Sequence, residues 1–316
     1  MATLTTATSN YSSTVVALVS QRLEEALRSR YPHIMPGNFT KGEVIADGYN
    51  SLTYVAYADL AAATTALTEG TTPTSQALTI AVDQATATQI GGVVEITDLA
   101  VVQSPHRLVE VAADKVADQA AKSMDILVRE ILGAGASVQY AGTATSRATV
   151  ATSHVITGAL VKKMYALLKR TNVPTFGDGS YHCILHPDAE YDLQTDTASG
   201  GWLDIQKYTD NSNLLSGETG RYGGVRFQIA SSSKVFATAG ASSANVYSAY
   251  FFGPDSYVVG DMQSLRTTFI APGGDHGDPL GQKALIGWKA TFGCMLLDAN
   301  GPRYVRLESG TTLNLG

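Results

Sequence analysis

Two groups of residues have the types and spacing of metal ligands. His182 and His186 enclose three residues in HCILH, and Asp275, His276 and Asp278 lie in the loop APGGDHGDPLG at 271–281. Two histidines four residues apart on a helix can share one transition-metal ion, whereas carboxylates in a glycine-rich loop suit a hard cation. A cation in the second group would support metal-dependent hydrolysis, because it could activate a bound water molecule.

The neighbouring sequence favours a structural interpretation of both groups. The β-branched and aromatic residues around HCILH favour a strand, in which side chains four residues apart are separated by about 13 Å, too far for one ion. The 271–281 loop lacks the acidic spacing and the closing glutamate of an EF-hand, and Asp and Gly are also the usual residues of turns. We therefore predict two structural histidines and a turn.

No other signature of catalysis or cofactor binding is present. The glycines at 200, 201, 220, 223 and 224 match neither a phosphate-binding loop nor a dinucleotide fingerprint, and no Gly-x-Ser-x-Gly elbow occurs. A group of basic residues could contact phosphate, but a solvated helix face is the default interpretation. This group is Lys162, Lys163, Lys169 and Arg170. The sequence thus predicts no catalytic residue, no cofactor and no bound metal.

The composition is that of a folded protein with a surface poor in charge. The chain has 316 residues, of which 44% are hydrophobic and 16% charged, enough for one large or two moderate domains. The charged fraction is below the usual quarter, which indicates surface that meets other protein, although a merely Ala- and Thr-rich sequence would look the same. The formal net charge of -6 argues against coating of nucleic acid through a basic surface.

The sequence carries no signal for export or membrane insertion. The N-terminus has neither the basic nor the apolar region of a signal peptide, and no uncharged apolar run is long enough to span a bilayer. Cys183 and Cys294 lie far apart in strand-like runs without ligand spacing, so we expect buried thiols in a reducing compartment. We expect no membrane partner.

Residues 105–132 predict one long amphipathic helix, around which the other elements are organised. Its apolar face is formed by Leu108, Ala112, Val116, Ala120, Met124, Leu127 and Ile131. Its charged face is formed by Lys115, Asp118, Lys122, Asp125 and Arg129. Here Asp125 and Arg129 are spaced as an i, i+4 ion pair. Ser104 is the expected N-cap and Gly133 the expected stop. We expect the apolar face to pack on the strands near the C-terminus.

The first hundred residues lack the composition of a compact domain. Residues 1–50 predict an extended arm with one helix at about 13–29, lying on its own body or on a neighbour. Residues 51–98 predict a strand-rich ribbon with a loop at 66–76 and an interruption at Gly91 and Gly92. Because an isolated two-stranded ribbon is marginal in water, we expect its stabilising contacts to be intermolecular.

The rest of the chain predicts a helix, a lobe and closing strands. Ser153 is expected to cap a second amphipathic helix at about 154–170. An α+β lobe follows at 180–260, with strands at 181–185, 225–229, 246–252 and 257–259 and a helical piece after Pro187. Strands are then expected at 265–270, 284–297 and 303–307, the second bending at Gly287 and Gly293.

This order of parts resembles the HK97-type major capsid proteins of tailed double-stranded DNA bacteriophages. LTEGTTPTSQALT is similar to the extended-loop tip of one subfamily from short-tailed and related phages, and YHCILHPDAEYDLQTD to its entry into the axial domain. The closing segment is similar in GPDSYVVGD and DPLGQKALIGWKATFGCMLLDANGPRYVRLESG. The resemblance covers most of the chain beyond about residue 50.

The resemblance implies an α+β, HK97-like capsid fold with five segments. These are an N-terminal arm at 1–50, an extended β-hairpin loop (E-loop) at 51–98, a peripheral domain at 99–178 with spine helix 105–132, an axial domain at 179–260, and a return to the peripheral domain at 261–316. It implies hexamers and pentamers on an icosahedral lattice around double-stranded DNA bound without sequence specificity, in a virion assembled in the host cytoplasm. Portal and separate scaffolding proteins are implied partners. The resemblance leaves open whether a decoration protein also binds the shell.

Two features differ from some members of that family. The arm is too short for a large cleaved N-terminal scaffolding region, so we expect none. No lysine occurs between Lys41 and Lys115, which excludes covalent cross-linking through a lysine of the E-loop.

Two other functions remain as alternatives. One is an encapsulin, a bacterial shell of the same fold that encloses enzymes. The other is a metal-dependent hydrolase that uses the 271–281 loop. The ribbon and the arm argue against an enzyme, because two long segments without a core do not help catalysis, and an enzyme should form a small, fixed oligomer.

Overall fold

The structure is a computed structural model of the whole chain. It describes residues 19, 22, 33, 51–57, 60–67, 69–70, 72–104, 107–196, 218–273, 277–278, 280–298, 301 and 303–313. The helix expected at 13–29 falls almost entirely outside these residues, as do Asp275 and His276 of the candidate metal loop.

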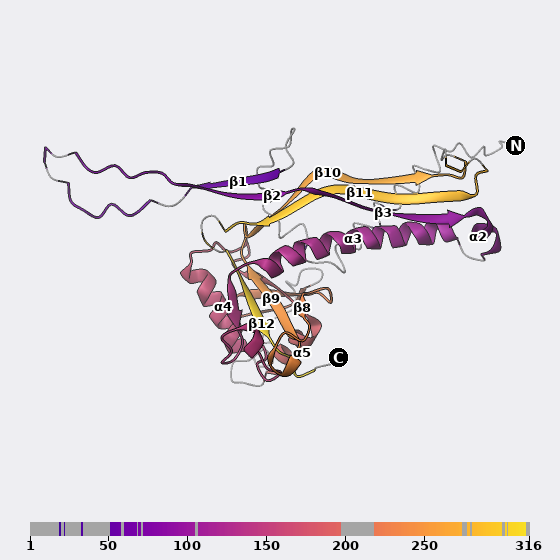
Figure 1. Cartoon of the computed structure of the whole chain (residues 1–316). Helices are drawn as coiled ribbons and strands as arrows, with labels where there is room; N and C mark the ends of the chain where they lie inside the picture. Colours follow the sequence, from indigo (N-terminus) through magenta and orange to yellow (C-terminus); the bar gives the residue numbers. More distant parts are fainter. Residues whose placement is uncertain are drawn as a thin grey trace.

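The described chain forms three parts: a long sheet backed by one helix, a hairpin that projects from it, and a compact lobe below (Figure 1). The long sheet has the order β10-β11-β3, with β3 at Thr88–Thr97, β10 at Tyr257–Ile270 and β11 at Lys283–Leu296. The hairpin pairs β1 (Ser51–Tyr57) with β2 (Ile80–Thr86). The short helix α2 (Asp98–Gln103) and the long helix α3 (Leu108–Ala134) follow β3.

Helix α3 packs on the long sheet, as the sequence predicts. Along β11 every second residue from Ala284 to Phe292 is buried, and these side chains meet α3 in one core. Val116 is fully buried in this core, and Leu108, Leu127 and Ile131 pack against it. The alanines of α3 carry little bulk, so the helix can lie close to the strands.

The boundaries of α3 differ from the prediction. The helix begins at Leu108, because Ser104 closes the preceding helix α2, whose N-cap Thr97 accepts a hydrogen bond from the N–H of Ala100. Gly133 lies inside the last turn, and Gly135 is the C-cap. The predicted stop at Gly133 was therefore wrong by two residues.

Asp125 is not on a solvated face of α3. Its carboxylate is fully buried and accepts hydrogen bonds from the backbone N–H of His33 at 2.9 Å and the hydroxyl of Ser232 at 2.8 Å. Arg129 pairs with Glu130 instead. The predicted Asp125–Arg129 pair was wrong, because this face of α3 is covered by residues far away in the sequence, among them His33 and Ser232.

The ribbon is shorter than predicted, because β3 belongs to the long sheet. Residues 88–97, expected in the E-loop, pair antiparallel with β11 from Thr88↔Phe292 to Thr97↔Lys283. Gly92 does not interrupt the strand. A Cβ at this position would lie 2.5 Å from Oε1 of Gln119, which accepts a hydrogen bond from the Trp288 indole at 3.3 Å. The glycine thus admits a polar contact between helix and sheet.

The lobe is built on a seven-stranded sheet with the order β4-β12-β9-β5-β7-β6, and β8 pairs with β9. Its strands are β4 (Val138–Tyr140), β5 (Tyr181–Leu185), β6 (Glu218–Tyr222), β7 (Val225–Ile229), β8 (Val235–Phe236), β9 (Val246–Phe252) and β12 (Tyr304–Ser309). Its helices are α4 (Gly158–Arg170) and α5 (Pro187–Gln194), with 3-10 turns at Arg147–Thr149 and Ala241–Ser243. Helices α4 and α5 share the second core with this sheet.

Three predictions for this part need correction. Helix α4 begins at Gly158 with Thr157 as N-cap, not at 154 with Ser153. The register shifts of the long sheet lie in β10, between Asp261 and Arg266, while β11 runs through its glycines. Residues 304–309, expected to return to the long strands, form β12 inside the lobe sheet, because they pair with β9 and β4.

Strand β12 also connects the lobe to the end of α3. Arg306 is almost fully buried and donates to the carbonyl oxygens of Gly133 and Gly135, the last carbonyls of that helix. Its guanidinium also donates to Glu308 at 2.9 Å, which receives two further bonds from Arg147 at 2.9 and 2.7 Å. A cation at a helix C-terminus is favourable, and the buried carboxylate is paired on both sides. Within the described residues no helix is both long and apolar enough to cross a bilayer.

We expect Val116→Asp to lower the free energy of unfolding of the subunit by at least about 3 kcal/mol, because it places a carboxylate in the core without a partner. Thermal melting of the soluble subunit measures this. Val111→Asp is the matched control, since Val111 lies on the same helix but is 47% exposed. Equal melting temperatures for the two variants would contradict the packing described above.

Candidate assembly surfaces

The HCILH segment forms a strand that ends just before its second histidine, as the sequence predicts. His182 lies in β5, and its ring stacks on Phe176 with 4.0 Å between the ring centroids. His186 follows the strand and caps α5, where its Nδ1 accepts the N–H of Asp188 at 3.2 Å. Burial lowers the pKa of His182 and of His186 below the usual value. Both imidazoles are engaged within the lobe.

Asp278 stabilises a turn at the start of β11. Its carboxylate accepts the N–H of Lys283 at 2.7 Å, and its carbonyl accepts the N–H of Gly281 at 3.2 Å. Across the described chain, no three His, Cys, Asp or Glu side chains gather as a metal site. Since Asp275 and His276 lie outside the described residues, the expectation that this loop binds no metal stays a prediction.

Both cysteines are buried free thiols, as expected. Burial raises the pKa of the Cys183 thiol well above its usual value and that of Cys294 to about 12. Since the thiolate is the reactive form, neither cysteine is suited to nucleophilic or redox chemistry.

The hairpin carries apolar side chains on a face that nothing in the described chain covers. Its cross-strand pairs Val55–Val82 and Tyr57–Ile80 lie on one face, and each of the four side chains is between 45% and 56% exposed. We call these four residues the hairpin ladder. Beyond the ladder the two strands of the hairpin separate into a long loop (Figure 1). Three leucines near the ends of β1 and β2 and in this loop are also exposed. These are Leu60, Leu67 and Leu78.

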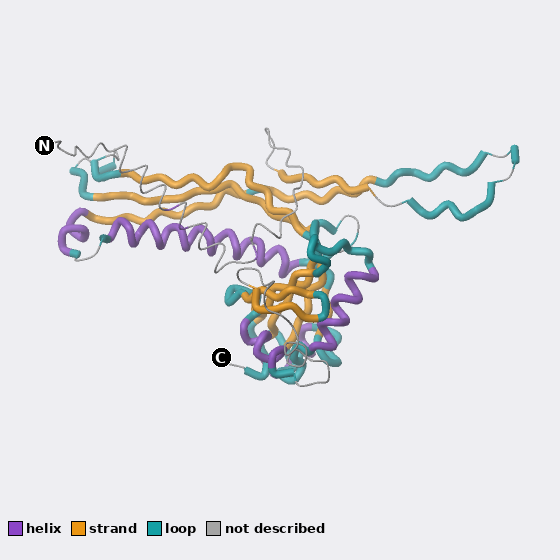
Figure 2. The backbone as a smooth tube through the Cα atoms, turned by 180° about the vertical axis from the view of Figure 1, so that it is seen from behind, coloured by secondary structure: helices purple, strands orange, loops and turns teal. Residues whose placement is uncertain are grey.

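The edges of the hairpin are not protected against pairing with other chains. From 51 to 86 the sequence contains no lysine or arginine. Among the described residues, only β1 and β2 form this sheet, and the hairpin extends away from the body in both views (Figures 1 and 2). A two-stranded ribbon with an open apolar face and no basic residue at its edges is an aggregation hazard unless partner chains cover it.

The base of the hairpin is anchored in a socket made of two glycines. Gly260 and Gly293 are cross-strand partners in β10 and β11, and the Leu52 side chain fills the space above them. Leu52 is 1% exposed and packs with Val258 and Met295 in a small core of its own. Gly293 was expected to bend its strand, but the missing side chains of Gly260 and Gly293 instead fix the position of the hairpin.

A second apolar surface lies at the opposite end of the long sheet, around α2 (Figure 1). No residue of α2 is buried. The exposed side chains here are Leu99, Val101, Val102, Val111 and Leu280. The molecule therefore presents apolar surface at both ends of its long axis.

Described residues of the arm bind the subunit's own body. Val19 is buried in the main core, and Arg22 forms an ion pair with Asp114 of α3 at 3.3 Å. The imidazole Nδ1 of His33 lies 3.0 Å from Asp125, and the carbonyl of His33 accepts the hydroxyl of Tyr257 at 2.9 Å. These contacts connect the arm to α3 and to the first residue of β10.

The sequence matches the family described as "Phage capsid protein" over residues 81–303. The chain belongs to the phage capsid protein family. This match includes β3, α3, both long strands and the lobe except β12, so it covers most of the residues that form the two cores.

Solved capsid structures share the fold at low sequence identity. "Capsid of Ralstonia phage GP4" is 17% identical, with a TM-score of 0.68 and 86% of each chain covered. "Cyanophage Pam1 capsid asymmetric unit" is also 17% identical, with a TM-score of 0.69, and covers 90% of this chain and 93% of its own. "Mycobacterium phage Che8" gives a TM-score of 0.58 at 14% identity, covering 83% and 86% of the two chains. No curated protein matches the chain.

The fold is therefore the α+β, HK97-like capsid fold that the resemblance implies. The protein is a major capsid protein of the phage shell, and the virion is where it functions. The family and fold are those of structural proteins. The hairpin ladder and the surface around α2 are therefore candidates for the surfaces by which copies meet.

We expect Gly293→Val to release the hairpin from the body. A Cβ on Gly293 would lie 2.7 Å from Cδ1 of Leu52, so the larger side chain must expel Leu52 at a cost of about 1–3 kcal/mol. Limited proteolysis of the soluble subunit should cut within 51–86 faster, while the lobe stays intact.

Gly177→Ala is the control, because a Cβ there meets nothing within 4 Å. Cleavage of the Gly293→Val hairpin at the rate of this control would show that the socket does not hold Leu52.

Proposed function

We propose that the chain assembles into hexamers and pentamers on an icosahedral lattice that encloses a phage genome. The observation that carries the proposal is the hairpin ladder, an open apolar surface on a ribbon without a core, in a chain of the phage capsid protein family. In a monomer this surface would be a liability, whereas in a shell each neighbouring copy can bury it.

The long sheet with α3 is proposed as the peripheral domain, and the lobe as the axial domain. In this assignment the E-loop is the hairpin at 51–86, since β3 is part of the long sheet. The lobe also contains β4 and β12 from outside 179–260. The arm at 1–50 keeps its proposed role as a segment that lies on the subunit body, supported by the contacts of Val19, Arg22 and His33.

Other partners follow from the same proposal. A portal and a separate scaffolding protein would guide closure of the shell in the host cytoplasm. Whether a decoration protein also binds the shell is left open. Double-stranded DNA would be enclosed without sequence-specific binding, in keeping with the net charge of -6. We propose no membrane partner.

The two alternatives have less support. An encapsulin would share the fold, but the family that matches the sequence is a phage capsid family. A metal-dependent hydrolase would need the 271–281 loop as its centre, and the Asp278 carboxylate already accepts a hydrogen bond from the backbone N–H of Lys283. We propose that the protein is not an enzyme.

Deleting residues 69–75 should stop closed shells from forming, or make them fragile, while the monomer stays folded. The deleted residues contribute to neither core, and the two cores supply the stability of the subunit. Electron microscopy and light scattering of purified protein measure assembly, and thermal melting measures folding.

A variant in which 69–75 is replaced by Gly and Ser at equal length separates loss of length from loss of sequence. Shells of normal size and heat resistance from the deletion variant would refute the role of the hairpin, and with it the main structural support for the lattice.

Replacing Asp275, His276 and Asp278 together by Ala should lower shell stability at most. Asp278 anchors the turn before β11, so a small loss in melting temperature is expected from that residue alone. A hydrolytic turnover in the wild type that this triple variant loses while it still assembles would favour the enzyme instead.

A further inference from the structure

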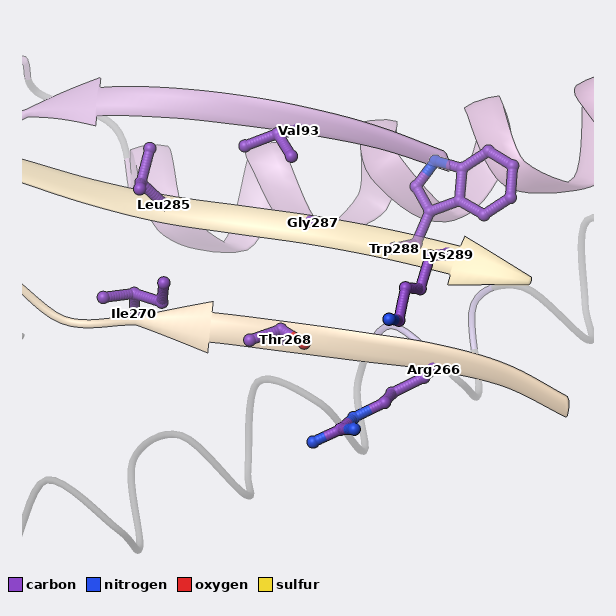
Figure 3. Close-up of a pocket in the computed structure, with 8 residues that line it drawn as sticks. All are labelled: Val93, Arg266, Thr268, Ile270, Leu285, Gly287, Trp288 and Lys289. Atoms are coloured by element: carbon purple, nitrogen blue, oxygen red, sulfur yellow. The ribbon is translucent and has the colours of Figure 1, made fainter. Parts of the chain in front are cut away.

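Helix α3 is covered on two sides by contacts of different chemistry. The long sheet packs on one side through the buried residues of β11. The opposite face of that sheet stays open, as a groove of about 280 Å³ that includes Val93, Thr268 and Arg266 (Figure 3). On another side of α3, the lobe segment 230–234 between β7 and β8 makes polar contacts. Since water can replace polar contacts, this second side is the more easily opened.

The polar contacts of this segment involve three side chains of α3. Ser232 donates to Asp125 at 2.8 Å, and its carbonyl oxygen accepts from Nη1 of Arg129 at 2.8 Å. Lys234 donates to Glu130 at 2.6 Å, and Nη2 of Arg129 donates to the same carboxylate at 2.6 Å. We call Asp125, Arg129, Glu130, Ser232 and Lys234 the polar clasp.

His33 of the arm completes the polar clasp at Asp125. Its backbone N–H donates to the Asp125 carboxylate at 2.9 Å, and its Nδ1 lies 3.0 Å from the same carboxylate, so Nδ1 is the donor. Its carbonyl oxygen accepts the hydroxyl of Tyr257 at 2.9 Å. The side chains of His33 and Asp125 are both 0% exposed. The carboxylate is therefore shared between the arm and the lobe in a site that excludes water.

The closed polar clasp leaves three buried polar atoms without a hydrogen-bond partner among the described residues. These are Nε2 of His33, Nε of Arg129 and Oγ of Ser233. A buried polar atom without a partner raises the free energy of the closed arrangement, and water would supply the partner if the clasp opened. The closed arrangement is thus held by the shared carboxylate and opposed by these three atoms.

We propose that seating of His33 closes the polar clasp, so that the position of the arm and that of the lobe segment 230–234 depend on each other. While His33 excludes water, the Ser232–Asp125 hydrogen bond forms at low dielectric constant and is strong. When His33 leaves, water competes for the carboxylate and the segment separates from α3, while Tyr250 of the lobe stays in the main core. Such coupling is reciprocal, so separation of the segment also weakens the binding of His33. This inference goes beyond the proposed function, because it concerns a single subunit.

A thiol in the lobe segment can report the opening. Ser233 is 3% exposed, and a cysteine in its place differs by one atom. Cys183 and Cys294 are buried, and burial raises the pKa of both thiols, so they react slowly with iodoacetamide. The Ser233→Cys reporter should be alkylated only when the segment leaves α3. Mass spectrometry of the soluble full-length subunit measures the rate.

In this reporter background, His33→Ala should raise the alkylation rate by about tenfold or more, as loss of a hydrogen bond to a charged group predicts. His33→Asn keeps an N–H donor near the position of Nδ1 and should stay within about threefold of the reporter alone. Ser232→Ala should also raise the rate, and it leaves the arm unchanged, so it provides the test if His33→Ala does not fold. Thermal melting checks that each variant is folded during the assay.

A double variant and a control separate coupling from general loosening. Because His33 and Ser232 act on one carboxylate, changing both to Ala should raise the rate by no more than about threefold beyond the larger single effect. Asp114→Ala removes another contact of the arm with α3, the ion pair with Arg22 at 3.3 Å. Both side chains of that pair are about half exposed, so this control should change the rate by less than about twofold.

Four results would overturn the proposal. The first is an unchanged alkylation rate in both His33→Ala and Ser232→Ala. The second is a double variant in which the two effects multiply, because the contacts would then be independent. The third is a rise with Asp114→Ala as large as that with His33→Ala. The fourth is a rise with His33→Asn equal to that with His33→Ala, because filled volume rather than hydrogen bonding would then hold the segment.

Discussion

The close packing of α3 on the long sheet is the contact on which the rest of the subunit depends. Small residues of the helix allow it to approach β11, and the buried row from Ala284 to Phe292 fills the space between them. The helix then provides sites for the other parts: Asp125 binds the arm and the lobe, and its last carbonyls accept Arg306 of the lobe sheet. The hairpin base is held by the same long strands, at Gly260 and Gly293.

The subunit divides its stability and its assembly between different surfaces. Both large cores lie in the sheet–helix layer and in the lobe, and the hairpin contributes only Leu52 and its neighbours to a small third core. The hairpin ladder and the α2 surface add little to folding, so their apolar side chains remain available for contacts between copies. This division allows a subunit to fold before it assembles.

The local pattern of the sequence was sufficient to predict the long helix, most strands of the lobe and the open ribbon. These features depend on periodicity within a short segment, which the residue types determine directly. The contact partners of Asp125 are 92 and 107 residues away, so no local pattern could show that this carboxylate is buried. The place of β12 in the lobe sheet, and of β3 in the long sheet, depends likewise on pairing between distant strands.

The socket of Leu52 also makes the hairpin a lever. The hairpin end at Glu69 lies at most roughly 55 Å along the chain from this fulcrum, so a rotation of about 10° at the base would displace the end by up to roughly 10 Å, more than the width of a side chain. The fulcrum consists of Leu52 over two glycines and of Ala87, the one residue that joins β2 to β3 of the long sheet. A small tilt at this narrow base would therefore change the direction of the hairpin, and a closed surface of varying local curvature places neighbours at different angles.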